Sequence, residues 1–151
     1  MGLIIYLAAP LFTQAERLWN IKLAEAITRK RNDITLKLPQ NEVYRARIPG
    51  EFDFQKLFNI CIEGIDQCDI LLAILDGADS DSGTCFECGY GFAKGKRIIG
   101  VRTDIRKGED QDLNAMLTRS CGLISFDASG EDPEIGIEKL AGIIIKKIFN
   151  K

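Results

Sequence analysis

The residues best able to carry out chemistry lie in the acidic segment DGADSDSGTCFE, at positions 76–87. Its four carboxylates are Asp76, Asp79, Asp81 and Glu87, and Ser82, Gly83 and Thr84 lie between the last two. The chain contains no histidine, so acid–base work must fall to carboxylates, tyrosine, lysine or cysteine. Two carboxylates in different protonation states are the pair that retaining glycoside chemistry uses. One attacks the anomeric carbon while the other assists the leaving group.

Composition excludes several other classes of function. Without histidine there is no Ser-His-Asp or Cys-His catalysis and no imidazole zinc site. The formal net charge is 20 − 22 = −2, which argues against a nucleic-acid partner, because such proteins normally carry a basic excess. The apolar start MGLIIYLAAPLF is too short to span a membrane. Five cysteines, an odd count, favour a reducing, cytoplasmic location over a disulfide framework.

The acidic segment also has a purely structural interpretation. Thr84 and Glu87 have the S/T-x-x-E spacing of a capping box, and the aspartates could simply form turns. If a helix begins near residue 85, Glu87 lies in its first turn. The helix dipole there favours the ionised carboxylate by about 0.3 to 1 kcal/mol. Glu87 therefore either caps its own helix or serves as an ionised catalytic group.

The elements that must position these residues follow from the hydrophobic pattern. Short apolar runs alternate with segments of helical period, which is typical of a parallel sheet with crossover helices. We expect strands at 3–9, 34–38, 70–75, 97–102 and 123–126, and helices at 14–31, 54–65, 85–94, 113–118 and 135–148, with a polar loop at 40–50. The length favours a single domain over 1–151.

This alternation predicts an α/β fold, a three-layer sandwich around a five-stranded parallel sheet with flavodoxin-like order 2-1-3-4-5. Ligands of such folds bind beyond the carboxyl ends of the strands, where the strand order reverses. The loop at 8–12 then lies beside the acidic loop at 76–84. Phe12, in the first of these loops, could stack on a base or could only pack against the protein.

Three segments carry a resemblance to a known family. They are IYLAAPLF at the start, DSGTCFECGYGFAKGK after the third expected strand, and LNAML at 113–117. In this order they resemble the nucleoside 2-deoxyribosyltransferases over nearly the whole chain. The resemblance implies an enzyme that cleaves a 2′-deoxynucleoside and passes the deoxyribosyl group to another nucleobase, with retention at C1′ and with no metal or cofactor.

The resemblance also implies residue roles. Glu87 would be the nucleophile that forms a covalent deoxyribosyl-enzyme, Tyr6 would orient Glu87, and Asp81 would assist protonation of the departing base. Asn114 and Met116 would come from a neighbouring subunit to meet the sugar 5′-hydroxyl. The chain would then be a homo-oligomer with shared sites.

One position departs from the family pattern. Many members carry a carboxylate or amide near the position of Cys61, whereas a thiol is a weak hydrogen-bonding group. Base recognition is therefore expected to rest on other polar groups, with Gly83 allowing a close backbone approach. The candidates for base recognition are Asp76, Asp79, Gln40 and Asn41.

Three alternatives stay open on the sequence. The first is a hydrolase of 2′-deoxynucleosides or their 5′-monophosphates, in which water replaces the acceptor base; by resemblance, Asn114 favours a free 5′-hydroxyl instead. The second is a non-catalytic nucleoside- or nucleotide-binding protein whose acidic loop only caps a helix. The third arises from the C-x-x-C of Cys85 and Cys88, which could indicate redox chemistry or two buried thiols.

Overall fold

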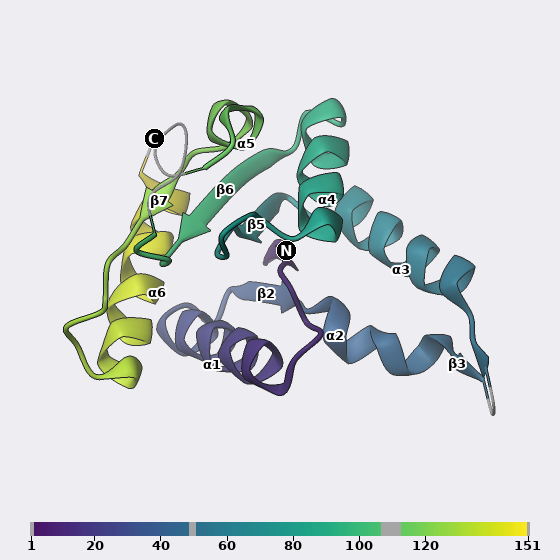
Figure 1. Ribbon diagram of the computed structural model, residues 1–151, viewed down its shortest axis with the longest axis horizontal. Helices are drawn as coiled ribbons and strands as arrows, with labels where there is room; N and C mark the ends of the chain where they lie inside the picture. The colour runs from purple at the N-terminus through teal and green to yellow at the C-terminus, as the bar shows by residue number, and fades with distance from the viewer. Residues whose placement is uncertain (1, 49–50, 107–112, 151) are drawn as a thin grey trace.

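Five parallel strands form the central sheet of the computed structural model, which describes residues 2–48, 51–106 and 113–150 (Figure 1). Their order is β2-β1-β5-β6-β7. The strands are β1 (Leu3–Ala8), β2 (Ile34–Lys37), β5 (Ile70–Ile74), β6 (Arg97–Arg102) and β7 (Ile124–Ser125). Counted along the chain, these five strands have the predicted order 2-1-3-4-5, so the predicted fold class is confirmed.

Helices cover both faces of the sheet (Figure 1). On one face, α1 (Gln14–Lys30) and α6 (Pro133–Phe149) pack on an aliphatic cluster that includes Leu23 and Leu140. On the other face, α3 (Phe54–Gln67), α4 (Ser82–Ala93) and α5 (Ala115–Ser120) pack on a second cluster. None of the helices in the described ranges is long and apolar enough to cross a membrane.

The alternation of side chains along β1 decides which layer receives each residue. Ile5 and Leu7 belong to the cluster under α1 and α6, whereas Tyr6 and Ala8 belong to the cluster under α3 and α4. Successive side chains of a strand point to opposite faces, and a central parallel strand is covered on both. The strand β1 lies between β2 and β5, so Tyr6 is directed into the layer that holds the acidic segment.

The prediction of a polar loop at 40–50 is wrong for most of these residues. This region holds α2 (Pro39–Glu42), the 3-10 helix η1 (Val43–Ala46) and the short strands β3 (Arg47–Ile48) and β4 (Glu51–Phe52). Proline is favourable at the first position of a helix, which explains why a helix starts at Pro39. Positions 49 and 50 lie outside the described residues.

The helix after β5 starts earlier than the sequence predicted. It begins at Ser82 instead of residue 85, because the side chain of Asp81 caps it by accepting from the Thr84 backbone N–H. The remaining predicted helices and strands are present, with small shifts at their ends.

Candidate active site

A partly buried hydrogen bond joins β1 to α4 at the centre of the candidate site. The hydroxyl of Tyr6 donates to Oε1 of Glu87 over 2.6 Å. Tyr6 is only 2% exposed, and burial, together with the neighbouring carboxylate, raises the pKa of its hydroxyl. The phenol therefore keeps its proton at neutral pH and remains a donor to Glu87.

The environment of Glu87 makes its carboxyl group titrate near neutral pH. Burial raises the pKa of Glu87 from 4.5 to about 7; the hydrogen bond from Tyr6 opposes this rise, and the Asp81 carboxylate adds to it. The expectation that the helix dipole favours ionisation is wrong here. The helix begins at Ser82, so Glu87 lies in its second turn, beyond the first turn in which the dipole acts most strongly.

The capping-box interpretation of Thr84 and Glu87 is also wrong. Oδ2 of Asp81 accepts from the backbone nitrogen of Thr84 at 2.8 Å and from its hydroxyl at 3.1 Å, so Asp81 is the cap. Glu87 instead points to Tyr6. A capping box does form elsewhere, between Thr13 and Glu16 at the start of α1.

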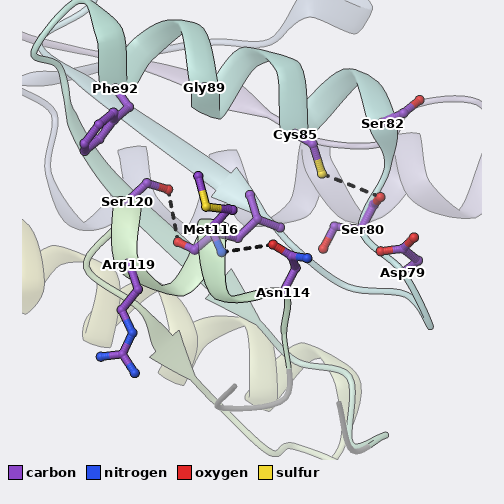
Figure 2. Close-up of a pocket in the computed structure, with 11 residues that line it drawn as sticks. Asp79, Ser80, Ser82, Cys85, Gly89, Phe92, Asn114, Met116, Arg119 and Ser120 are labelled. Atoms are coloured by element: carbon purple, nitrogen blue, oxygen red, sulfur yellow. Dashed lines mark hydrogen bonds between the residues drawn. The ribbon is translucent and has the colours of Figure 1, made fainter. Parts of the chain in front are cut away.

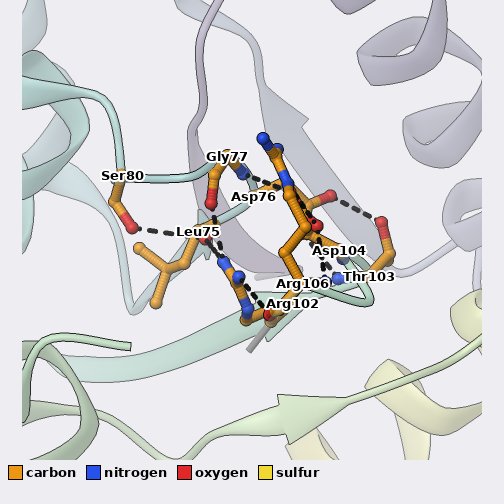
Figure 3. Close-up of polar contacts among 8 residues, drawn as sticks. All are labelled: Leu75, Asp76, Gly77, Ser80, Arg102, Thr103, Asp104 and Arg106. Carbon is orange, nitrogen blue, oxygen red and sulfur yellow. Dashed lines mark hydrogen bonds and ion pairs between the residues drawn. The ribbon is translucent and has the colours of Figure 1, made fainter. Parts of the chain in front are cut away.

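Asp76 holds the turn after β5 in place. Its carboxylate accepts from the backbone nitrogen and the hydroxyl of Thr103, both at 2.5 Å, and from the backbone nitrogen of Asp104 at 2.9 Å (Figure 3). Both oxygens therefore bind the loop that follows β6. Asp76, a sequence candidate for base recognition, is engaged in joining two loops.

Arg102 fixes the same turn and was missed by sequence reasoning. Its buried guanidinium donates to the carbonyl oxygens of Leu75 at 2.9 Å, Gly77 at 3.1 Å and Arg106 at 3.0 Å (Figure 3). Gly77 has φ +118°, a conformation that favours glycine. The turn that leads to Asp81 is thus held by Asp76 and Arg102 together. A lone arginine at the end of a strand gives no local signal of this role.

The two polar candidates on α2 have different surroundings. Gln40 is buried: its Oε1 accepts from Nδ2 of Asn20 and its Nε2 donates to the carbonyl oxygen of Arg17, both at 3.0 Å. This amide therefore joins α2 to α1. Asn41 is exposed and lines a cavity of about 410 Å³ together with Tyr6 and Cys61. Only Asn41 of this pair is open to a ligand.

Phe12, the aromatic candidate, is 70% exposed in the loop after β1. It is therefore not a packing residue within this chain. The exposed ring remains available to stack on a base, as the sequence allowed.

A second cavity, of about 550 Å³, lies between α4 and α5 (Figure 2). Its lining includes Asp79, Ser82, Cys85, Gly89, Phe92, Asn114 and Met116, but not Glu87. Cys85 and Gly89 lie on one side of α4, and Glu87 is about 160° around the helix from each. Asn114 and Met116 therefore lie across α4 from the Tyr6–Glu87 pair of their own chain.

The segment that holds Asn114 and Met116 faces outward. Asn114 caps α5, with its Oδ1 accepting from the backbone nitrogen of Met116 at 2.9 Å (Figure 2). The Met116 side chain is 80% exposed. The sequence predicted both residues as ligand contacts, and the structure places both on the open surface of the second cavity.

The remaining sequence candidates lie close to the start of α4. Asp79 and Gly83 are exposed, and Asp81 is half-buried. Cys85 and Cys88 are free thiols, and burial raises the pKa of Cys88 to about 12. A reactive cysteine needs a lowered pKa, so the redox interpretation of the C-x-x-C has no support in this environment.

Comparisons with known proteins give one family. The sequence matches the family model described as nucleoside 2-deoxyribosyltransferase over residues 5–118. Among curated protein sequences, none matches this chain. Similar solved structures include a conserved protein from Enterococcus faecalis V583, with 26% identity, a TM-score of 0.73, and 97% of this chain and 99% of that chain covered.

Two similar structures are described as 2-deoxyribosyltransferases. The protein from Bacillus psychrosaccharolyticus shares 26% identity with a TM-score of 0.66, over 89% of this chain and 90% of that chain. The protein from Leishmania mexicana shares 23% identity with a TM-score of 0.64, over 93% of this chain and 98% of that chain.

Replacing Glu87 by glutamine should stabilise the fold at neutral and higher pH. The pKa of Glu87 rises from 4.5 to about 7 on folding, so the folded state favours the protonated carboxyl. The wild-type protein therefore loses stability as the pH rises from about 4.5 to 7, by roughly 1 to 3 kcal/mol, whereas Glu87→Gln has no such charge. Thermal unfolding of both proteins near pH 5 and near pH 8 should show a Tm difference that grows at the higher pH. A difference independent of pH would contradict this account.

Proposed function

The chain belongs to the nucleoside 2-deoxyribosyltransferase family, and we propose that it transfers a 2-deoxyribosyl group between nucleobases through a covalent bond to Glu87. The observation that carries this proposal is the hydrogen bond of 2.6 Å from the buried Tyr6 hydroxyl to Oε1 of Glu87. It fixes one carboxylate oxygen and leaves Oε2 to act as the nucleophile. The proposed substrates are a 2′-deoxynucleoside and a second nucleobase.

The reaction would proceed in two displacements. Ionised Glu87 attacks C1′, the C1′–N bond breaks, and the departing base takes the electron pair together with a proton relayed from solvent. The transition state resembles an oxocarbenium ion, which a nearby carboxylate stabilises. A second base then attacks C1′, gives up its N–H proton to solvent by the same route, and releases Glu87. Two inversions give net retention at C1′.

Other residues would act on the base and the sugar. Asp81 lies close enough to Glu87 to affect its pKa, and the cap bonds to Thr84 fix its Oδ2. We infer that Asp81 assists protonation of the leaving base through its other oxygen. Phe12 and Asn41 supply an exposed ring and an amide for the base, and Asp79 and Gly83 are exposed at the entrance to α4.

We infer that the site is completed by a second subunit. Asn114 and Met116 line a cavity that does not include their own Glu87. The same cavity exposes Met116 and Phe92, two large apolar side chains, and exposed apolar patches of this kind mark interaction surfaces. The proposed assembly is a homo-oligomer in which Asn114 and Met116 meet the sugar held by the partner's Tyr6 and Glu87.

The other candidate functions have less support. The non-catalytic interpretation, in which the acidic loop only caps a helix, accounts for Asp81 but not for Glu87, which is bonded to Tyr6. A hydrolase would use the same Glu87 with water as the acceptor, so transfer and hydrolysis differ only in what reacts with the covalent intermediate. Product analysis separates these two.

Glu87→Ala should reduce deoxyribosyl transfer by about three orders of magnitude or more, because it removes the covalent nucleophile. The assay incubates deoxyinosine, thymidine or deoxyadenosine monophosphate with and without adenine. New nucleoside indicates a transferase, free base alone indicates a hydrolase, and no product indicates a binding protein. Glu25→Ala, at an exposed position of α1, is the matched control and should keep full activity. A folded Glu87→Ala protein that still transfers would reject the mechanism.

The reaction rate should increase with pH on the acid side of neutrality. Since the pKa of Glu87 is about 7 in the free protein, the nucleophile is mostly protonated at lower pH. We expect kcat/KM to rise with pH and to level off above a midpoint near 7, because kcat/KM reports the ionisation of the free enzyme. A profile that is flat between about pH 5 and pH 8 would show that the reaction does not depend on ionised Glu87.

Mixing two impaired variants should restore activity if sites are shared. Subunits with Glu87→Ala keep Asn114, and subunits with Asn114→Ala keep Glu87. After the two are refolded together in equal amounts, about a quarter of the sites should combine both intact residues. Each variant refolded alone is the control. No recovery in a mixed assembly would show that Asn114 acts within its own chain or not at all.

A further inference from the structure

We propose that Gly64 is a positioning residue. Because it has no side chain, the Tyr6 ring can lie against α3 at the position from which its hydroxyl reaches Glu87. Gly64 lies inside α3 and lines the same cavity of about 410 Å³ as Tyr6 and Asn41. The inference rests on the proposed function for its effect on catalysis, although its geometric part stands by itself.

The ring lies directly against the helix at this position. A Cβ atom placed on Gly64 would be 2.7 Å from Cε2 and 2.8 Å from Cδ2 of Tyr6. Carbon atoms in ordinary contact are about 3.5 to 4.0 Å apart. Any side chain at position 64 would therefore require the ring or the helix to move by roughly 0.8 Å.

The backbone of Tyr6 is fixed by the sheet, and its ring packs against neighbouring side chains as well as bordering the cavity of about 410 Å³. Tyr6 pairs with Lys37 on one side and Leu71 on the other, in the middle of the sheet. Its side chain is buried in the cluster that includes Ile65 and Cys68. Its hydroxyl is already 2.6 Å from Glu87, near the short limit of O–H···O bonds. A shift toward Glu87 would compress this bond, and a shift away would lengthen it.

Helix propensity gives no reason for a glycine here. Glycine is less favourable than alanine in a helix interior, so α3 would be more stable with alanine if nothing else were involved. Gly142, in the interior of α6, offers a comparison, because a Cβ there would meet no atom within 4 Å. The close approach at Gly64 is therefore a feature of its contact with Tyr6 and not of helix glycines in general.

The chemical consequence follows from the role of the Tyr6 hydroxyl. Its hydrogen bond lowers the pKa of Glu87 and so opposes the effect of burial. A displaced ring would weaken this bond and leave Glu87 harder to ionise. Gly64 thereby affects the fraction of enzyme that carries an ionised nucleophile without touching the substrate.

The first test compares Gly64→Ala with Gly142→Ala. For Gly64→Ala we expect the midpoint of Glu87 ionisation to rise by about one pH unit, so that kcat/KM falls about tenfold at pH 6 and about twofold at pH 8. The midpoint is measured by NMR titration of the Glu87 carboxyl carbon, which needs no activity. Gly142→Ala should change neither quantity. A wild-type kcat/KM at pH 6 and an unchanged midpoint in Gly64→Ala would overturn the proposal.

The second test repeats the substitution in a Tyr6→Phe background. The phenyl ring keeps the contact with helix α3 but lacks the hydroxyl, so Gly64→Ala should leave the Glu87 midpoint unchanged there. The same rise in both backgrounds would overturn a role that acts through the hydroxyl. Because the titration is independent of turnover, a protein without transfer activity would refute the proposed function and still leave the role of Gly64 testable.

A stability comparison applies even if Gly64→Ala folds poorly. Tyr6→Leu removes the ring, and in this background Gly64→Ala should be neutral or should raise Tm, since alanine favours the helix. In the wild-type background it should lower Tm. An equal loss of Tm in both backgrounds would show that the ring is not what excludes a side chain at position 64.

Discussion

The candidate site depends on a partly buried carboxyl group and on the phenol that donates a hydrogen bond to it. Glu87 is on α4 and Tyr6 is on β1, 81 positions away, and their bond of 2.6 Å connects helix to sheet. Burial of a charge is unfavourable unless a partner compensates for it, and here the compensation is partial, since the pKa of Glu87 is still about 7. The site therefore contains a group that is close to balance between its charged and neutral forms.

The fold supplies the rigidity that this balance requires. The alternation of side chains along β1 directs Tyr6 into the layer under α3 and α4. Asp76 and Arg102 fix the turn that follows β5, and Asp81 fixes where α4 begins. Each contact lies at or beyond the carboxyl ends of the strands, the edge where ligands of such folds bind. The carboxylates that fix this loop, Asp76 and Asp81, therefore lie close in sequence to Glu87.

Much of the fold and part of the candidate site could be predicted from the sequence. Apolar periodicity is a local property, and it predicted the strands and the strand–helix alternation from which the order 2-1-3-4-5 was inferred. The start of α4 could not be predicted, because Asp81 and Thr84 are both good caps and the backbone decides between them. Asp76 and Gln40 bind partners 27 and 20 positions away, respectively, and no local pattern shows such contacts. The sequence identified acidic and amide groups but could not separate those that hold the protein together from those open to a ligand.

The buried carboxylate has a consequence for the energies along the proposed reaction. Once C1′ is attached, Glu87 is an ester, which carries no charge and loses little when water is excluded. The free enzyme, by contrast, keeps a poorly hydrated anion whenever the pH exceeds about 7. Formation of the glycosyl ester relieves this unfavourable state, so the same burial that makes ionisation difficult also favours bond formation to the sugar.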